Sequence, residues 1–399
     1  MVEDRAIGSA TIRQSVTVAA LGITQTLAWG SSYYLPAILA DDMAGAIGVP
    51  RTWVFAAFSA SLLLAAVLGP SVGRAIDQRG GSGVLVASNA VLAVGLVGLS
   101  LCTGITTLVL AWAVMGVGMA LGLYDAAFAT LAGIYGREAR GPITGITLIA
   151  GFASTVGWPL SALLDMNFGW RGTCLAWAAI NVLIGLPLNL LLIPRASGRQ
   201  DPKHQGPAMW EPRKEMILLA YVFAASWFVT GAMATHLPTL LERMGATTVQ
   251  AIAAAALVGP AQVAARLAEF LIMRHTHPLI SARVAASMHP IGAAVLAALG
   301  PPAATAFALL HGAGNGLLTI ARGTVPLALF GPEGYGARTG LLGAPARAAQ
   351  AAAPLLFGVL IDVMGRDVLA VSSGLCLSAL AALLVLKATS APTRQTRRM

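Results

Sequence analysis

Several ionisable side chains lie inside long apolar stretches of this sequence, where they could bind a charged molecule. Arg347 is near the middle of the stretch 339–361, and Gln350 follows three positions later on the same helical face. A guanidinium keeps its proton, and its planar fork matches a carboxylate. If the stretch spans a membrane, this charge costs roughly 2.5–3.5 kcal/mol and requires a partner. Arg347, with Gln350, is therefore a candidate ligand for an anion, and a structural pair with Asp125 or with a backbone carbonyl is the alternative.

Asp125 itself lies beside Tyr124 in the apolar stretch 106–129. Burial in an apolar environment favours the neutral, protonated form of a carboxyl group. Asp125 is therefore a candidate for carrying a proton. An ion pair with an arginine from the second half of the chain is the other interpretation.

A further set of polar side chains shares one stripe of the stretch 303–328. His311, Asn315 and Arg322 are spaced i, i+4 and i+11. Asn315 is expected near mid-depth, where its amide could contact a bound molecule. An imidazole titrates near neutral pH, so His311 is a candidate for proton coupling, although a packed histidine also fits the pattern. Arg322 is expected near the inner end, with its head group extended to the interface.

The composition indicates which elements must position these side chains. Of the 399 residues, 57% are hydrophobic and 10% are charged, with a mean hydropathy of +0.77. Soluble domains carry roughly 25% charged residues. Because so few charges could not cover a soluble surface, a soluble enzyme, a nucleic-acid-binding protein and a disordered protein are all disfavoured. The three cysteines are far apart and match no metal or disulfide motif, so no cofactor or metal is expected.

Twelve stretches are long and apolar enough to cross a membrane as helices, each of which needs about 20 residues. A polar segment, 194–214, separates six stretches from six. It predicts a cytoplasmic linker between an N-terminal bundle, 1–193, and a C-terminal bundle, 215–399. The stretches are 16–39, 52–72, 83–101, 106–129, 142–164, 172–193, 215–240, 248–272, 281–300, 303–328, 339–361 and 367–387.

The distribution of lysine and arginine predicts the orientation. With the N-terminus in the cytoplasm, 18 of the 25 basic residues fall on the cytoplasmic side, 4 on the other side and 3 within the spans. The positive-inside rule then places both termini in the cytoplasm and the chain in the inner (plasma) membrane as a multi-pass protein. The net charge of +9 is explained by residues that face anionic lipid, and no nucleic-acid partner is expected.

The two halves of the sequence repeat. Tyr34 and His236 each precede Leu-Pro at an offset of 202, and two Gly-x-Gly pairs and two apolar-Asp pairs recur at offsets of 196 and 197. Six helices per half give both repeats the same orientation, with a substrate site between them. Tyr34 and His236 are therefore candidates for lining that site, and interfacial anchoring is the alternative. The glycine pairs are interpreted as close helix packing: Gly116, Gly118, Gly312 and Gly314.

The segment after the second stretch resembles a loop signature of the major facilitator superfamily, Gly-x-x-x-Asp-Arg-x-Gly-Arg-Arg. Gly73, Asp77 and the glycine after Arg79 match, whereas Gln78 stands where a basic residue is expected. The resemblance implies an all-α membrane protein, with twelve transmembrane helices in two pseudo-symmetric six-helix bundles. In that fold Gly73 would allow close packing. Asp77 beside Arg74 and Arg79 would form a conformational gate; a plain solvated turn is the alternative.

Other segments look closer to the monocarboxylate and oxalate/formate porters of this superfamily, mainly 29–34, 49–53 and 259–266. The resemblance implies that Arg266 is an anion ligand, which with Arg347 would place two cations across a central cavity.

The same resemblance leaves the proton acceptor open. Gln262 stands where those porters carry an aspartate, four residues before Arg266. Glu269, three residues after Arg266, could replace that aspartate or could instead neutralise Arg266.

The expected function is secondary active transport of a small organic anion, with a carboxylate as the expected chemical class. The transporter is expected to work by alternating access and as a monomer. Efflux of drugs or other small solutes by proton antiport is the alternative. Drug antiporters carry an arginine four residues before a glycine of the fourth helix, and Trp112 stands there before Gly116. An enzyme is not expected, since no nucleophile–base pair or metal cluster is recognisable.

Overall fold

The computed structural model describes residues 2–195, 214–273 and 275–387, which form helices joined by short turns, without a strand in these ranges. The all-helical class predicted from the sequence is therefore confirmed. The predicted linker lies mostly outside the described residues, at 196–213.

The first half contains α1 (Val2–Ser31), α2 (Pro36–Ile47), α3 (Arg51–Arg79), α4 (Ser82–Ser100), α5 (Ile105–Gly122), α6 (Tyr124–Tyr135), η1 (Gly136–Ala139), α7 (Arg140–Ala150), α8 (Ala153–Ile180), η2 (Asn181–Gly185) and α9 (Leu186–Leu192). The second half contains α10 (Lys214–Arg243), α11 (Thr248–Ala256), α12 (Val258–Ala268), η4 (Glu269–Met273), α13 (Pro278–Leu299), η5 (Pro301–Ala303), α14 (Ala304–Phe330), α15 (Tyr335–Met364), η6 (Gly365–Asp367) and α16 (Val368–Val385).

Some predicted spans are broken rather than continuous. The stretch 16–39 is interrupted by a turn at residues 32–35, and the stretch 106–129 is interrupted at Leu123. Pro36 starts the helix after the first break, because proline lacks the amide hydrogen that a continuous helix would use. Continuous helices were the wrong expectation at these two places. Both breaks lie beside the cavity described below.

Eight helical stretches of the described residues are long and apolar enough to cross a membrane. Two of them, Ile105–Leu192 with 88 residues and Tyr335–Val385 with 51, exceed a single crossing, which takes about 20 residues. The first reverses direction at Gly169, whose φ of 66° is a left-handed conformation that glycine adopts without steric cost. Each of these two stretches therefore contains more than one crossing.

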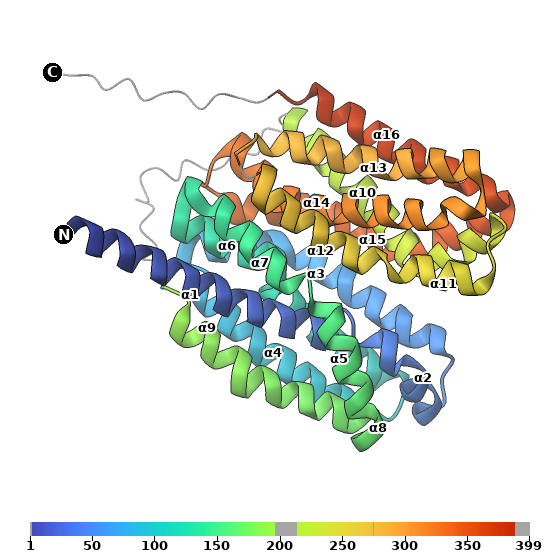
Figure 1. Cartoon of the computed structure of the whole chain (residues 1–399). Coiled ribbons are helices and arrows are strands. Elements are labelled where there is room, and N and C mark those ends of the chain that lie inside the picture. Colours follow the sequence, from blue (N-terminus) through green and yellow to red (C-terminus); the bar gives the residue numbers. More distant parts are fainter. Residues whose placement is uncertain (1, 196–213, 274, 388–399) are drawn as a thin grey trace.

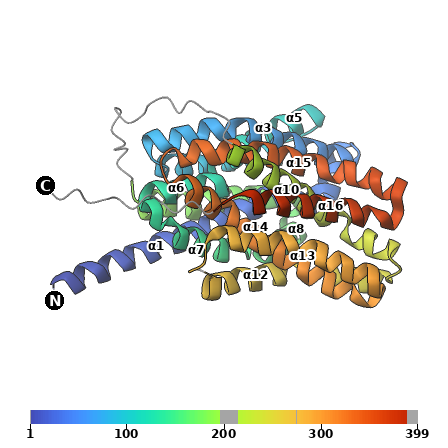
Figure 2. The ribbon, with the colours of Figure 1, turned by 90° about the horizontal axis from the view of Figure 1, so that it is seen from above.

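The helices lie side by side in one elongated bundle (Figures 1 and 2). α1 begins and α16 ends at the same end of this bundle, on the left in Figure 1. A chain that starts and finishes on one side crosses an even number of times, in agreement with the twelve predicted.

The buried apolar side chains form clusters that follow the chain order. One large cluster is formed almost entirely by residues between Ala20 and Ile193, and two smaller clusters by residues between Met216 and Leu386. Large apolar side chains such as Leu191 and Leu271 are exposed on the outside. In a multi-pass membrane protein such side chains face lipid, which is as apolar as the helix interior. Packing between helices therefore depends on small residues and polar contacts.

A chain of buried side-chain amides supplies such contacts within the first half. Asn189 donates to Asn89 at 2.7 Å, Asn89 donates to Asn181 at 3.1 Å, and Asn181 donates to Ser31 at 3.0 Å. Thr24 donates to the Asn189 carbonyl oxygen at 3.1 Å. These bonds join α1, α4, η2 and α9, and polar groups of this kind hold helices together in lipid.

The glycine pairs are packed as predicted. A Cβ on Gly116 would lie 2.6 Å from the Ser61 carbonyl oxygen, and one on Gly312 would lie 2.6 Å from the Val258 carbonyl oxygen. A Cβ on Gly118 would lie 2.7 Å from the Leu92 side chain, and one on Gly314 would lie 2.8 Å from the Ala285 carbonyl oxygen. Only residues without a side chain allow these helices to approach so closely.

Candidate functional site

A cluster of three buried charges joins the two halves of the chain. Asp125 accepts a hydrogen bond from Arg322 at 2.7 Å and a second, short one from Arg347 through the same oxygen, Oδ2. All three residues are at most 7% exposed. Asp125 comes from α6, whereas the arginines come from α14 and α15. With two guanidinium groups and one carboxylate ionised, the cluster carries a net charge of +1.

Backbone groups position each of the three charged side chains. Leu123 is extended between α5 and α6, so Asp125 falls in the first turn of α6, where unpaired backbone amides favour an anion. Gly343 of α15 lies against the ion pair, and a Cβ there would be 2.9 Å from both Asp125 and Arg322. Arg347 is anchored further by donating to the Ala65 carbonyl oxygen at 3.1 Å. The arginines are thus held in place before any ligand arrives.

The charges face a cavity at the boundary between the two halves of the chain. Its polar side is formed by Asp125, Arg322, Arg347 and Gln350. Its apolar side is formed by Trp29, Tyr33, Leu62, Leu123, Tyr124 and Trp227. Both halves contribute to it, as parallel repeats of transporters do. An anion with an apolar body matches this division.

The expected extension of Arg322 to the interface is wrong. It does not reach the interface but is 6% exposed, bonded to Asp125, with its guanidinium 4.5 Å from the centre of the Trp227 ring. It lies eight residues before the end of α14, roughly 12 Å inside that end. This depth, together with a carboxylate to pair with, explains why the side chain stays buried.

Arg266 is buried but is not one of the two arginines of this cavity. It donates to the carbonyl oxygens of Thr147, across the halves, and of Gly316, and to the side chains of Gln262 and Thr319. The expected pair of Arg266 and Arg347 across one cavity is therefore replaced by Arg322 and Arg347. A role of Arg266 as an anion ligand stays a prediction.

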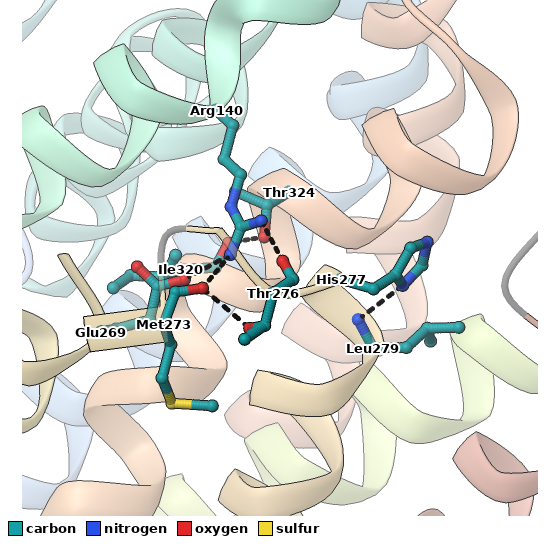
Figure 3. A network of polar contacts seen from close by, with 8 residues as sticks. All are labelled: Arg140, Glu269, Met273, Thr276, His277, Leu279, Ile320 and Thr324. Atoms are coloured by element: carbon teal, nitrogen blue, oxygen red, sulfur yellow. Dashed lines mark hydrogen bonds and ion pairs between the residues drawn. The ribbon is translucent and has the colours of Figure 1, made fainter. Parts of the chain in front are cut away.

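Glu269 pairs with Arg140 of α7 at 2.9 Å, and not with Arg266. Arg140 also donates to the carbonyl oxygens of Met273 and Thr276 (Figure 3). A guanidinium from the first half of the chain thus caps the carbonyl end of η4 in the second half. The interpretation that Glu269 neutralises Arg266 is thus wrong, because Glu269 forms its ion pair with Arg140 of α7. A role in proton coupling stays a prediction.

His277 lies beside this network in Figure 3, outside the spans, and its Nδ1 accepts from the Leu279 amide at the start of α13. Its partial burial and the neighbouring guanidinium groups of Arg140 and Arg283 hold its pKa below the usual value. A neutral imidazole is what this helix cap requires, since an imidazolium could not accept the bond.

His311 has a buried partner that the sequence did not reveal. Its Nδ1 lies 3.0 Å from Nδ1 of His289 on α13, and His289 Nε2 lies 3.0 Å from the Ser372 hydroxyl on α16. Both histidines line a second cavity within the second half, together with Asn315, which accepts from Thr230 at 3.1 Å. His289 could have been noticed as an ionisable residue in the stretch 281–300.

Three other candidates are placed as follows. Gln350 lines the charged cavity and donates to the Tyr33 hydroxyl at 2.7 Å, across the halves. Tyr34 packs edge-on against Tyr33 and Trp158 in the turn between α1 and α2. His236 Nε2 contacts the Pro354 carbonyl oxygen at 2.7 Å. Tyr34 and His236 line neither cavity described here, so their proposed role remains a prediction.

Asp77 contacts the other half through backbone rather than arginine. It accepts from the Gly336 and Ala337 amides at the start of α15, each at 2.8 Å. Arg74 instead donates to Ser71, and Arg79 is exposed. An anion at a helix N-terminus is stabilised by the unpaired amides and the helix dipole. This contact closes the end of the bundle where α1 begins.

Gly73 makes that contact possible. A Cβ on Gly73 would lie 1.9 Å from the Gly336 carbonyl oxygen, which is backbone and cannot rotate away. We expect Gly73→Ala to push α3 and α15 apart and to cost about 1–3 kcal/mol of stability. Thermal unfolding in detergent measures this, and transport should fall in parallel. Gly83→Ala is the matched control, because nothing lies within 4 Å of that position. Equal unfolding temperatures for both variants would contradict the prediction.

A helical membrane bundle with a polar cavity between its two halves is the arrangement that secondary transporters use. The chain belongs to the Major Facilitator Superfamily, whose family model matches residues 21–343. This agrees with the superfamily resemblance of the sequence. The resemblance to the monocarboxylate and oxalate/formate porters stays a prediction.

Individual proteins similar to this chain support the fold. It is 28% identical over 202 residues to an uncharacterized 38 kDa protein in a 23S RNA operon of Thermoproteus tenax, a match that spans 50% of this chain and about half, 52%, of that relative. The human organic anion transporter MFSD10 (TETRAN) has a TM-score of 0.73 at 18% identity, with 93% of this chain and 99% of that chain covered. FucP in the outward conformation has a TM-score of 0.74 at 12% identity, covering 94% and 99%. At these identities the two structures show the fold alone.

Proposed function

We propose that this protein is a secondary transporter of a small organic anion, a carboxylate, held by Arg347 and Arg322. The observation that carries the proposal is the excess of one positive charge among three buried ionised groups that line a cavity between the halves. A buried guanidinium favours an anion whose geometry it can match with two hydrogen bonds. A cationic drug would instead meet two arginines, which disfavours drug efflux.

Asp125 would couple the anion to a proton. Its carboxylate occupies a position on the two arginines that a substrate carboxylate could also occupy. Protonation of Asp125 removes its charge and weakens both ion pairs, which frees the guanidinium groups for the substrate. Anion and proton would then bind together, and their charges would cancel. The site is consequently suited to symport of a carboxylate with a proton.

Transport would proceed by alternating access between the bundles 1–193 and 215–399. Polar contacts between these halves include those of Asp125 and Gln350 at mid-depth and those of Asp77 and Arg140 at the end where α1 begins. Among the described residues, hydrogen bonds and ion pairs at the opposite end stay within one half, as for Arg51 with Asp41 and Arg171 with Cys102. This supports a state closed at the first end, which the basic-residue distribution assigns to the cytoplasm.

The purified protein in proteoliposomes tests the proposal. Uptake of labelled acetate, lactate, oxalate and benzoate would be measured with and without an inward proton gradient, against protein-free liposomes. We expect at least one carboxylate to accumulate, and the acidic exterior to increase its accumulation. Transport of cations with no carboxylate transported would refute the anion site, whereas carboxylate uptake that ignores pH would refute only the coupling.

A further inference from the structure

Trp29 lines the charged cavity, and its indole N–H is a buried hydrogen-bond donor without a partner in the described part of the chain. Trp29 is 9% exposed, and its Nε1–H donates no hydrogen bond to the described residues. Leaving a buried donor unpaired is costly, and such groups in native proteins require an explanation. A ligand with an acceptor atom in this cavity would supply the missing bond.

The rings around Trp29 are ordered by contact with one another. The centre of the Trp29 ring lies 5.2 Å from the centre of the Tyr33 ring and 5.0 Å from that of Tyr124. Tyr124 stacks on Phe128 with 5.2 Å between the ring centres. Rings fixed in this way lose little conformational entropy when they contact a ligand. They form a rigid apolar wall from the first half of the chain.

The second half of the chain contributes the remaining aromatic residue of the lining, Trp227, beside the arginines. Trp227 of α10 lies under the Arg322 guanidinium, which approaches the ring centre to 4.5 Å. Aromatic side chains pack favourably against the faces and edges of other flat rings. A guanidinium is also attracted to the face of an aromatic ring. A compact hydrophilic anion would contact the arginines but leave the aromatic surfaces and the Trp29 donor without partners.

We infer that the substrate is a carboxylate with a flat, unsaturated or aromatic body, seated between the Trp29–Tyr33–Tyr124 wall and Trp227. Its carboxylate lies at Arg322 and Arg347, and the Trp29 N–H donates to one of its oxygens. This inference rests on the proposed anion transport and specifies its substrate class.

Trp112 offers a matched control for Trp29. It is also a tryptophan of the first half whose Nε1 is buried without a partner, yet it is fully buried against Phe58 and does not line the cavity. Trp29→Phe and Trp112→Phe therefore make the same chemical change, one inside the site and one outside it.

The experiment measures binding of labelled benzoate to the detergent-purified protein, with cinnamate, acetate and lactate as competitors. We expect benzoate and cinnamate to bind at least tenfold more tightly than acetate and lactate. Trp29→Phe should weaken benzoate binding about tenfold or more, the size of a lost hydrogen bond to a charged group, and Trp112→Phe by less than twofold. The comparison of ligands uses the unmodified protein, so this part of the test does not depend on whether a variant folds.

The outcomes separate this inference from the proposed function. If compact and aromatic carboxylates bind equally well, and Arg347→Lys weakens them all, anion transport stands and the aromatic substrate class is wrong. If Trp29→Phe and Trp112→Phe behave alike, the donor role of Trp29 is wrong. If no carboxylate binds the protein, the proposed function fails and this inference fails with it.

Discussion

Replacing Arg347 by alanine is expected to abolish carboxylate transport. The guanidinium holds Asp125 and the Ala65 carbonyl oxygen and faces the cavity, so its loss removes one of two cations available to a substrate. Truncating one partner of a buried, hydrogen-bonded charge pair costs about 2–5 kcal/mol, which corresponds to a loss of roughly 30-fold to several-thousand-fold in affinity. The measurement is the initial rate of uptake at substrate concentrations well below saturation.

Two further variants make this result interpretable. Arg347→Lys keeps the charge but cannot form the two-pronged contact, so an intermediate rate is expected. Arg283→Ala removes an arginine of α13 that donates to the Leu383 and Leu386 carbonyl oxygens and does not line the cavity. Its rate should stay within a few fold of the unmodified protein. An Arg347→Ala protein that folds and transports as well as Arg283→Ala would contradict the anion site.

Replacing Asp125 by asparagine is expected to uncouple transport from the proton gradient. Asparagine keeps the shape but can neither bind a proton nor compete as an anion for Arg322 and Arg347. The variant should exchange carboxylate across the membrane, while an acidic exterior no longer drives accumulation. The measurement is the ratio of internal to external carboxylate as the gradient is varied.

Asp362→Asn is the control for this change. Asp362 is exposed at the end of α15 and has only a loose contact, 4.0 Å, with Arg243. Accumulation by Asp125→Asn that responds to the gradient as fully as Asp362→Asn does would disprove coupling through Asp125. Asp125→Ala would be less informative, because it leaves two buried arginines unpaired and should destabilise the fold by about 3–5 kcal/mol.

The sequence alone was sufficient for the class of protein and for part of the site. Runs of about 20 apolar residues, a second half that repeats the first, and the segment around Asp77 indicated a helical transporter of this superfamily, which the family match confirms. These are local properties, since hydropathy and the cost of a charge in a span depend on residues near in sequence. Asp125 and Arg347 were conspicuous for the same reason.

Only the tertiary structure decided which of these groups meet. Arg322 stands 197 residues from Asp125, and nothing near it in sequence shows that α6 and α14 bring the two together. Likewise, Glu269 finds Arg140 because α7 crosses η4, although Arg266 is closer in sequence. Trp29 and Trp112 are alike as residues in apolar spans, and only the break at Leu123 and the packing around it place one of them in the cavity. The composition of a stretch predicts whether its side chains are buried, because it depends on neighbouring residues. Which buried charges form ion pairs depends on how helices distant in sequence pack.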